Sequence, residues 1–214
     1  MGKSGWMLLL GLWSAAGWAK SLDVQLLDNK GKALGEAVLW IEPGPALGPD
    51  TPALMDQKRR QFTPYILPVQ VGTTVSFPNS DPINHHVYSF SPAKRFELRM
   101  HQHKAAPQEV LFEQPGLVTL GCNIHDWMLG FILVLDSPWF TQTDKDGRAR
   151  LDFSPAAGQR LHVWHPRINE TSETTQRPLG GETSLTWQLS SPLKRDPRPK
   201  TPKMRPQGKG GYVP

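Results

Sequence analysis

Short runs of alternating apolar and polar residues follow one another along the chain, and each ends at a glycine, proline, asparagine or aspartate. The turn residues recur about every 8–12 positions, which is typical of the short strands of β-sandwiches and barrels. In "RFELRM", for example, Phe96, Leu98 and Met100 alternate as they would on one face of a strand. No stretch between these turns has a convincing helical pattern. The spacing therefore predicts an all-β protein.

Two turns of similar composition, "DNKGK" and "DKDGR", lie between alternating strands near the two ends of the folded region. Such hairpins resemble those of transthyretin-like or carboxypeptidase-regulatory sandwiches. We expect a β-hairpin in residues 20–54 and further strands in 137–190 to build an outer sandwich. A second β-domain, residues 55–136, would then be inserted between its halves. A single extended sandwich is the alternative.

The first 19 residues have the features of an export signal. Lys3 precedes a long apolar run, and the small residues Gly17 and Ala19 stand at the −3 and −1 positions before Lys20. The apolar run is shorter than the ~18–20 residues that span a bilayer. We therefore expect residues 1–19 to be cleaved, and the mature protein to be periplasmic or otherwise exported, without a transmembrane segment.

The C-terminal segment is basic and rich in proline and glycine. Residues 192–214 contain seven Lys or Arg and one Asp, a local balance of +6, so the total of +5 leaves −1 for the remaining 191 residues. With almost no large apolar side chains, residues 191–214 are expected to form a disordered tail. Such a tail could tether the protein to an acidic partner or envelope surface, or simply be solvated. Nucleic acid is not an expected partner.

The chain has one cysteine, Cys122, which excludes a disulfide within the chain. It lies in "GCNIHDWMLG", three residues before His125 and six before Met128, and "NSDPINHHV" supplies His85 or His86 from an earlier turn. A thiolate, two imidazoles and a weak thioether are the ligands of a blue-copper site. An inert buried cysteine with coincidental histidines is the alternative.

These motifs resemble the cupredoxins, the plastocyanin and amicyanin family of small blue-copper proteins. The resemblance rests on "VQVGTTVSFPNSD", on "HHV" and on the C-x-x-H-x-x-M cluster, and it covers roughly residues 62–135. The stretch also looks like plastocyanin-like proteins often called methylamine utilisation proteins. The resemblance implies a Greek-key β-sandwich and one type 1 copper ion, with His85, Cys122 and His125 as equatorial ligands and Met128 as the axial ligand.

The sequence departs from the family pattern in two places. His86 stands where the family usually has asparagine, and since successive strand residues point to opposite faces, only one of His85 and His86 can face the copper. We favour His85, which aligns with the family's first histidine. Asp126 and Trp127 stand where amicyanin-type loops carry proline, and Asp126 could orient His125 or tune the potential from outside the ligand set.

The resemblance implies an electron carrier that docks transiently with redox partners and is not an enzyme. Phosphate-binding glycine loops, nucleophile elbows and zinc-protease motifs are absent from the part of the sequence that we expect to fold. Two other hypotheses remain from the residues alone. One is a copper chaperone or sensor that uses the same donors, and the other is a metal-free β-sandwich that serves as an interaction module.

Overall fold

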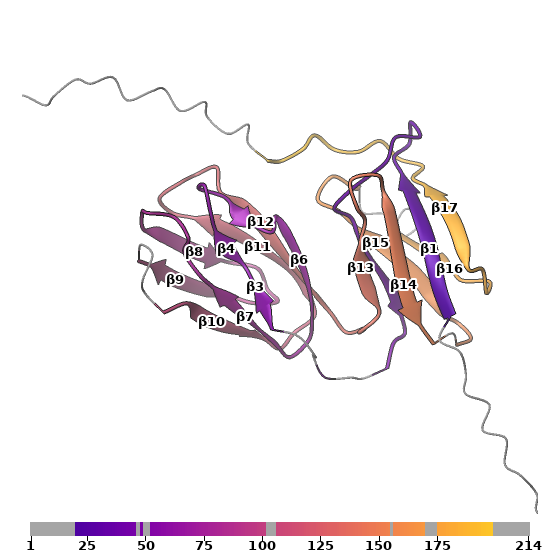
Figure 1. The fold of residues 1–214 in the computed structure, drawn as a ribbon, viewed down its shortest axis with the longest axis horizontal. Coiled ribbons are helices and arrows are strands. Elements are labelled where there is room, and N and C mark those ends of the chain that lie inside the picture. Colours follow the sequence, from indigo (N-terminus) through magenta and orange to yellow (C-terminus); the bar gives the residue numbers. More distant parts are fainter. Residues whose placement is uncertain are drawn as a thin grey trace, which may run out of the picture.

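The computed structural model describes residues 20–45, 48, 52–101, 106–154, 156–169 and 175–198. The expected leader, residues 1–19, lies outside these ranges. Within them nearly all of the regular secondary structure is β-strand, which confirms the predicted all-β class. Among the described residues, none belongs to a helix that is long and apolar enough to cross a membrane. The strands form two groups that lie side by side in Figure 1.

The first group combines strands from both ends of the chain in two sheets, ordered β14–β1–β17 and β13–β2–β15–β16. Strands before residue 43 therefore share sheets with strands after residue 139. The transthyretin or carboxypeptidase-regulatory type that we expected for this outer sandwich stays a prediction. Its strands are β1 (Lys20–Leu27), β2 (Val38–Glu42), β13 (Phe140–Gln142), β14 (Arg148–Phe153), β15 (Arg160–Trp164), β16 (Gln176–Pro178) and β17 (Ser184–Gln188).

The predicted hairpin between β1 and β2 is wrong, because the two strands belong to different sheets. Strand β1 pairs with β14 and β17, and β2 pairs with β13 and β15. The turn itself forms as expected: the Asp28 carboxylate accepts the backbone N–H groups of Lys30 and Lys32, and Gly31 has a φ of 78°. The chain then crosses to the opposite sheet, so that β1 and β2 bury side chains in one core from opposite sides.

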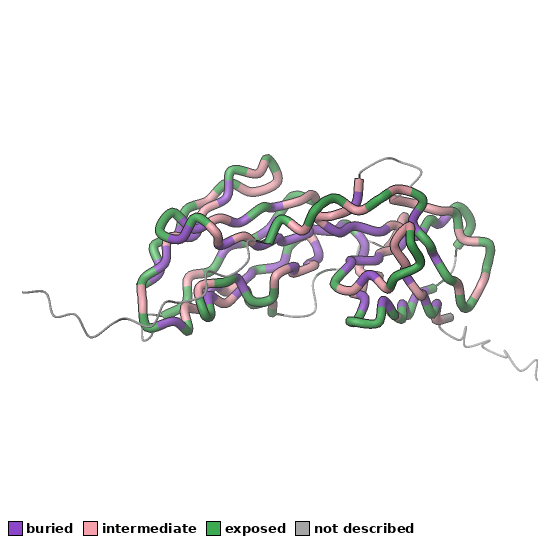
Figure 2. The backbone as a smooth tube through the Cα atoms, turned by 90° about the horizontal axis from the view of Figure 1, so that it is seen from above, coloured by how far each residue is buried: buried purple, intermediate pink, exposed green. Residues whose placement is uncertain are grey.

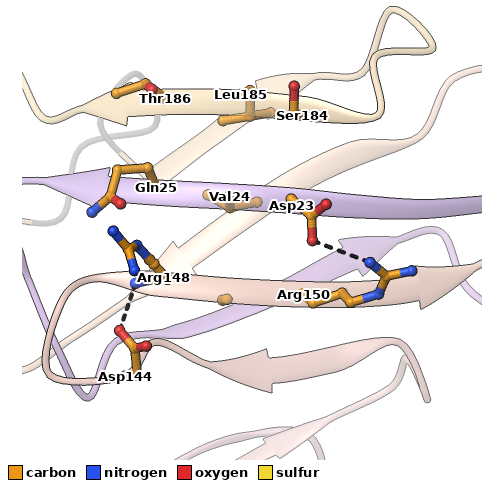
Figure 3. Close-up of a pocket in the computed structure, with 10 residues that line it drawn as sticks. Asp23, Val24, Gln25, Asp144, Arg148, Arg150, Ser184, Leu185 and Thr186 are labelled. Carbon is orange, nitrogen blue, oxygen red and sulfur yellow. Dashed lines mark hydrogen bonds and ion pairs between the residues drawn. The ribbon is translucent and has the colours of Figure 1, made fainter.

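Outside that core, the sheet β14–β1–β17 presents a shallow depression to solvent (Figure 3). The alternation of the strands places Leu22 and Leu26 in the core and Asp23 on the open face. Asp23 forms an ion pair of 3.5 Å with Arg150 of the neighbouring strand. This face is therefore polar and carries paired opposite charges.

The second group is a sandwich formed by residues 53–135. One sheet is ordered β10–β7–β3 and the other β6–β12–β11–β8–β9, and the short pair β4–β5 lies beside them. Its strands are β3 (Ala53–Leu54), β4 (Asp56–Gln57), β5 (Phe62–Thr63), β6 (Ile66–Gln70), β7 (Thr73–Phe77), β8 (His85–Ser89), β9 (Phe96–Met100), β10 (Gln108–Phe112), β11 (Gly116–Cys122) and β12 (Leu129–Leu135). Both sheets contribute to one buried core, which includes Phe77, Phe112 and Leu120.

Strand β12 is buried on both faces, which explains its unbroken apolar sequence "GFILVL". Ile132 and Val134 point into the core of their own sandwich, whereas Phe131 and Leu133 join a separate cluster with Trp164 of the outer sandwich. The rings of Phe131 and Trp164 meet edge to face at 5.4 Å. Figure 2 shows stretches of buried residues in both groups and exposed residues around their outside. The two groups of strands therefore share an apolar contact.

Residues 191–198 are part of the packed structure, so the prediction of a disordered tail is wrong for this stretch. Leu193 packs against the core of the outer sandwich. Arg198 forms an ion pair of 2.7 Å with Glu36 and lies 4.7 Å from the centre of the Tyr65 ring. Composition failed here because it measures what a segment can bury by itself, whereas these side chains use surfaces that other strands supply. Residues 199–214 lie outside the described ranges.

The close packing of β12 against β5 can be tested at Gly130. A methyl group added there would lie 2.8 Å from the Cβ atom of Phe62, which is buried and cannot move without its backbone. We expect Gly130→Ala to lower the free energy of unfolding by about 1–3 kcal/mol, as overpacked core sites do. Gly48, where the same methyl group would meet nothing within 4 Å, provides the control. Equal denaturation midpoints for the two variants would contradict this packing.

Candidate metal centre

Strand pairing brings Cys122 and His85 together. Cys122 is the last residue of β11 and His85 is the first residue of β8, and these antiparallel strands place Cys122 opposite Val87. In β8 the buried residues are His85, Val87 and Ser89, and in β11 the buried face includes Leu120 and Cys122. The thiol and the imidazole therefore point into the same core from neighbouring strands.

The loop between β11 and β12 adds His125. A hydrogen bond of 2.9 Å from the backbone N–H of Met128 to the carbonyl of His125 closes its turn. The Sγ atom of Cys122 lies 3.7 Å from Nδ1 of His85 and 3.7 Å from Nδ1 of His125. One donor atom from each of these three residues lies within 4.8 Å of the others, and all three residues are buried. This group could hold a metal ion.

Met128, the expected axial ligand, is buried in the same core cluster as Cys122. Its position after the turn places it at the end of the sandwich where the loop enters β12. Its role as an axial ligand stays a prediction.

The other predicted residues lie around the group. The His86 ring points away from the core, where it contacts Glu97 and the side-chain amide of Asn123. Asp126 is exposed. Trp127 packs its ring against that of His125 at 5.2 Å. Since His86 lies on the outer face of the sheet, His85 is the histidine that the structure places with Cys122.

Sequence reasoning missed Asp81. Its carboxylate oxygen Oδ2 lies 3.0 Å from Nε2 of His85, and both residues are buried. The signal available was an aspartate four residues before a candidate ligand, in "DPINH". Such a spacing carries little information in a turn, where it does not set a direction for the side chain. The three-dimensional path of the turn was needed to find the contact.

The contacts of the group change the proton affinities of its members. Burial alone would raise the pKa of the Cys122 thiol, but hydrogen bonds from His85 and from backbone groups outweigh it and lower the pKa to about 6. Burial likewise works to lower the pKa of His85, and hydrogen bonds with Cys122 and Asp81 raise it above its ordinary value. The cysteine is thus available near neutral pH as a thiolate, the form that binds metals.

The chain is similar to several solved copper proteins, although two other comparisons found no match. No protein-family model matches the sequence, and no curated protein matches it. A novel purple cupredoxin from Nitrosopumilus maritimus is 24% identical over 39% of this chain and 99% of its own, with a TM-score of 0.34. A Cu(I) form of a mutant amicyanin is 21% identical over 47% of this chain and 99% of its own, with a TM-score of 0.36. The match to the Cu-containing nitrite reductase (NirK) from Thermus scotoductus SA-01 is 24% identical, covers 40% of this chain and 22% of the reductase, and has a TM-score of 0.35.

Residues 53–135 form a two-sheet β-sandwich with the candidate donor group at one end. Two sheets enclose one core, and a cysteine and two histidines from two strands and a loop meet at one end of it. This is the arrangement that the resemblance to cupredoxins predicts.

The lowered pKa of Cys122 predicts the pH dependence of the metal-free protein. Because the folded value, about 6, lies below the unfolded value of about 8.5, folding favours the thiolate. The resulting stabilisation is complete above pH 8.5 and declines as the pH falls toward 6. Thiolate absorbance in the ultraviolet should titrate near pH 6 in the folded protein and be missing in Cys122→Ser. A midpoint at or above about 8.5 would contradict the assigned contacts.

Proposed function

We propose that the protein binds one copper ion in a type 1 site and carries single electrons between redox partners. Nδ1 of His85, Sγ of Cys122 and Nδ1 of His125 would be the equatorial donors, and the Met128 thioether would be the axial donor. The observation that supports this most is the convergence of three buried donors from separate elements, with donor atoms within 4.8 Å. Their chemical types suit copper in both oxidation states: soft sulfur favours Cu(I), and imidazole accommodates Cu(II).

The placement of the donors favours electron transfer over copper delivery. His85 and Cys122 lie on paired strands inside a packed core, where side chains have little freedom to rearrange. Copper bound there would supply one-electron redox chemistry, and a rigid donor set would keep the change in geometry between its two oxidation states small. A chaperone, by contrast, has to release its ion, for which buried donors are poorly suited.

Partner docking would take place where the loop reaches the surface. His125 is 8% exposed, and the neighbouring Ile124 is 54% exposed, so the loop offers an apolar contact beside a metal ligand. A small contact of this kind suits a weak and short-lived redox complex. The basic residues near the C-terminus would add attraction to an acidic partner. We further propose, from the features of residues 1–19 alone, that the protein acts after export.

The neighbouring histidines provide a matched test of the copper site. Purified protein with one equivalent of Cu(II) should show an intense blue absorption band and an EPR spectrum with narrow copper hyperfine splitting. His85→Ala and Cys122→Ser should lose both signatures, whereas His86→Ala should retain them, because His86 lies on the outer face of its strand. Loss of the blue band in His86→Ala with retention in His85→Ala would overturn the ligand assignment. Colourless binding of Cu(I) alone would favour a chaperone or sensor.

A further inference from the structure

The two ring nitrogens of His85 have different partners. Nδ1 lies 3.7 Å from Sγ of Cys122, and Nε2 lies 3.0 Å from Oδ2 of Asp81. His85 is 2% exposed and Asp81 is 6% exposed, so neither contact can be replaced freely by water. An ionised carboxylate can only accept hydrogen bonds. The contact therefore favours a proton on Nε2, which leaves Nδ1 to face the donor group and, once a metal is bound, to present its lone pair to it.

A specialised turn holds the Asp81 carboxylate in place. The backbone N–H of Arg59 donates to Oδ1 at 2.6 Å, and that of Arg60 donates to Oδ2 at 2.7 Å. Both arginines have left-handed backbone conformations, with φ values of 57° and 56°. Lys58 and Gln61 close the turn through reciprocal backbone hydrogen bonds of 3.0 and 3.2 Å. Consecutive N–H groups arranged in this way form an anion-binding concavity.

Non-glycine residues adopt the left-handed conformation at an energetic cost, and two in succession are uncommon. In the β4–β5 turn, the two residues with this costly conformation, Arg59 and Arg60, are the ones whose backbone N–H groups bind the Asp81 carboxylate. Two further hydrogen bonds hold the segment of chain that leads into Asp81. The Ser80 hydroxyl donates to Asp56 at 2.7 Å, and the backbone N–H of Asp81 donates to the Asn79 side chain at 3.1 Å. The hairpin β4–β5 and the turn before β8 are therefore joined around Asp81.

We propose that Asp81 is a positioning residue of the metal centre, which fixes the tautomer and orientation of His85 and lowers the reduction potential of the bound copper. This inference rests on the proposed copper function. Both effects depend on the turn Lys58–Gln61, because this turn holds the Asp81 carboxylate against His85 and keeps it ionised inside the protein.

The direction of the effect follows from charge. A buried negative charge beside a ligand stabilises the more positive Cu(II) state over Cu(I), since the surrounding protein screens it less than water would. A carboxylate that accepts a hydrogen bond from the second ring N–H also makes the imidazole a stronger electron-pair donor to the metal. Both effects favour Cu(II) and so lower the potential. A neutral acceptor at the same place would supply the hydrogen bond without the charge.

The test compares Asp81→Asn with wild-type protein. Asparagine has nearly the same shape and its oxygen can still accept from His85 and Arg60, but it lacks the charge, and its NH2 group cannot accept from the N–H of Arg59. We expect the copper-loaded variant to keep a blue band and to have a higher reduction potential than wild type, whereas Asp81→Glu should stay closer to wild type. Glu97→Gln is the matched control, because Glu97 contacts the outward-facing His86 in an exposed carboxylate–histidine pair. Its potential should be unchanged.

A second measurement needs neither copper nor a variant. In the metal-free wild-type protein, nitrogen-15 NMR should show a proton on Nε2 of His85, and this proton should exchange slowly with water. An Nε2 atom that carries no proton, or one whose proton exchanges rapidly, would overturn the assigned contact. This NMR measurement can still be made if Asp81→Asn does not fold.

The outcomes separate the two proposals. If wild-type protein does not bind copper, the proposed function fails, and the NMR measurement alone decides whether Asp81 positions His85. If copper binds with a blue spectrum but Asp81→Asn has the wild-type potential, the role of Asp81 in tuning the copper is refuted while the copper function stands. A higher potential in Asp81→Asn, with no change in Glu97→Gln, supports both.

Discussion

The candidate metal centre depends on one strand register, the antiparallel pairing of β8 with β11. This pairing sets Cys122 opposite Val87 and therefore places His85, two residues earlier, on the same core-facing side of the sheet. A shift by one residue would turn His86 to the core and His85 to solvent. The choice between two adjacent histidines is thus made by hydrogen bonds of the sheet, and the core beneath them makes that register strongly preferred.

The rest of the fold stabilises the ends of the loop that carries His125 and Met128. Strands β11 and β12 pair along most of their length on either side of this loop. Strand β12 is further held between two cores, since Ile132 packs into its own sandwich and Phe131 packs against Trp164 of the outer one. The outer sandwich therefore contributes to the centre without supplying a donor: it covers the face of β12 that would otherwise be exposed to solvent.

The sequence was sufficient to predict the features that depend on residue type and on the spacing of apolar residues, namely the fold class and the candidate donors. Alternation identified the all-β class, and soft and nitrogen donors at short spacing identified Cys122, His125 and Met128 as candidates. Long-range pairing was not predictable in the same way, because the turn at Asp28 looks like that of a hairpin whether β2 pairs with β1 or crosses to another sheet. Asp81 was missed for a related reason. Its partners, two arginine backbone groups with left-handed φ values, have no signature in residue type.

We propose that the core-facing His85, Cys122 and His125 bind copper together. A crystal structure of the Cu(II)-loaded protein tests it most directly. We predict one ion bonded to Sγ of Cys122 and to Nδ1 of His85 and His125, with Nε2 of His85 still in contact with Asp81. An ion bound through His86, or one bound away from Cys122, would contradict it.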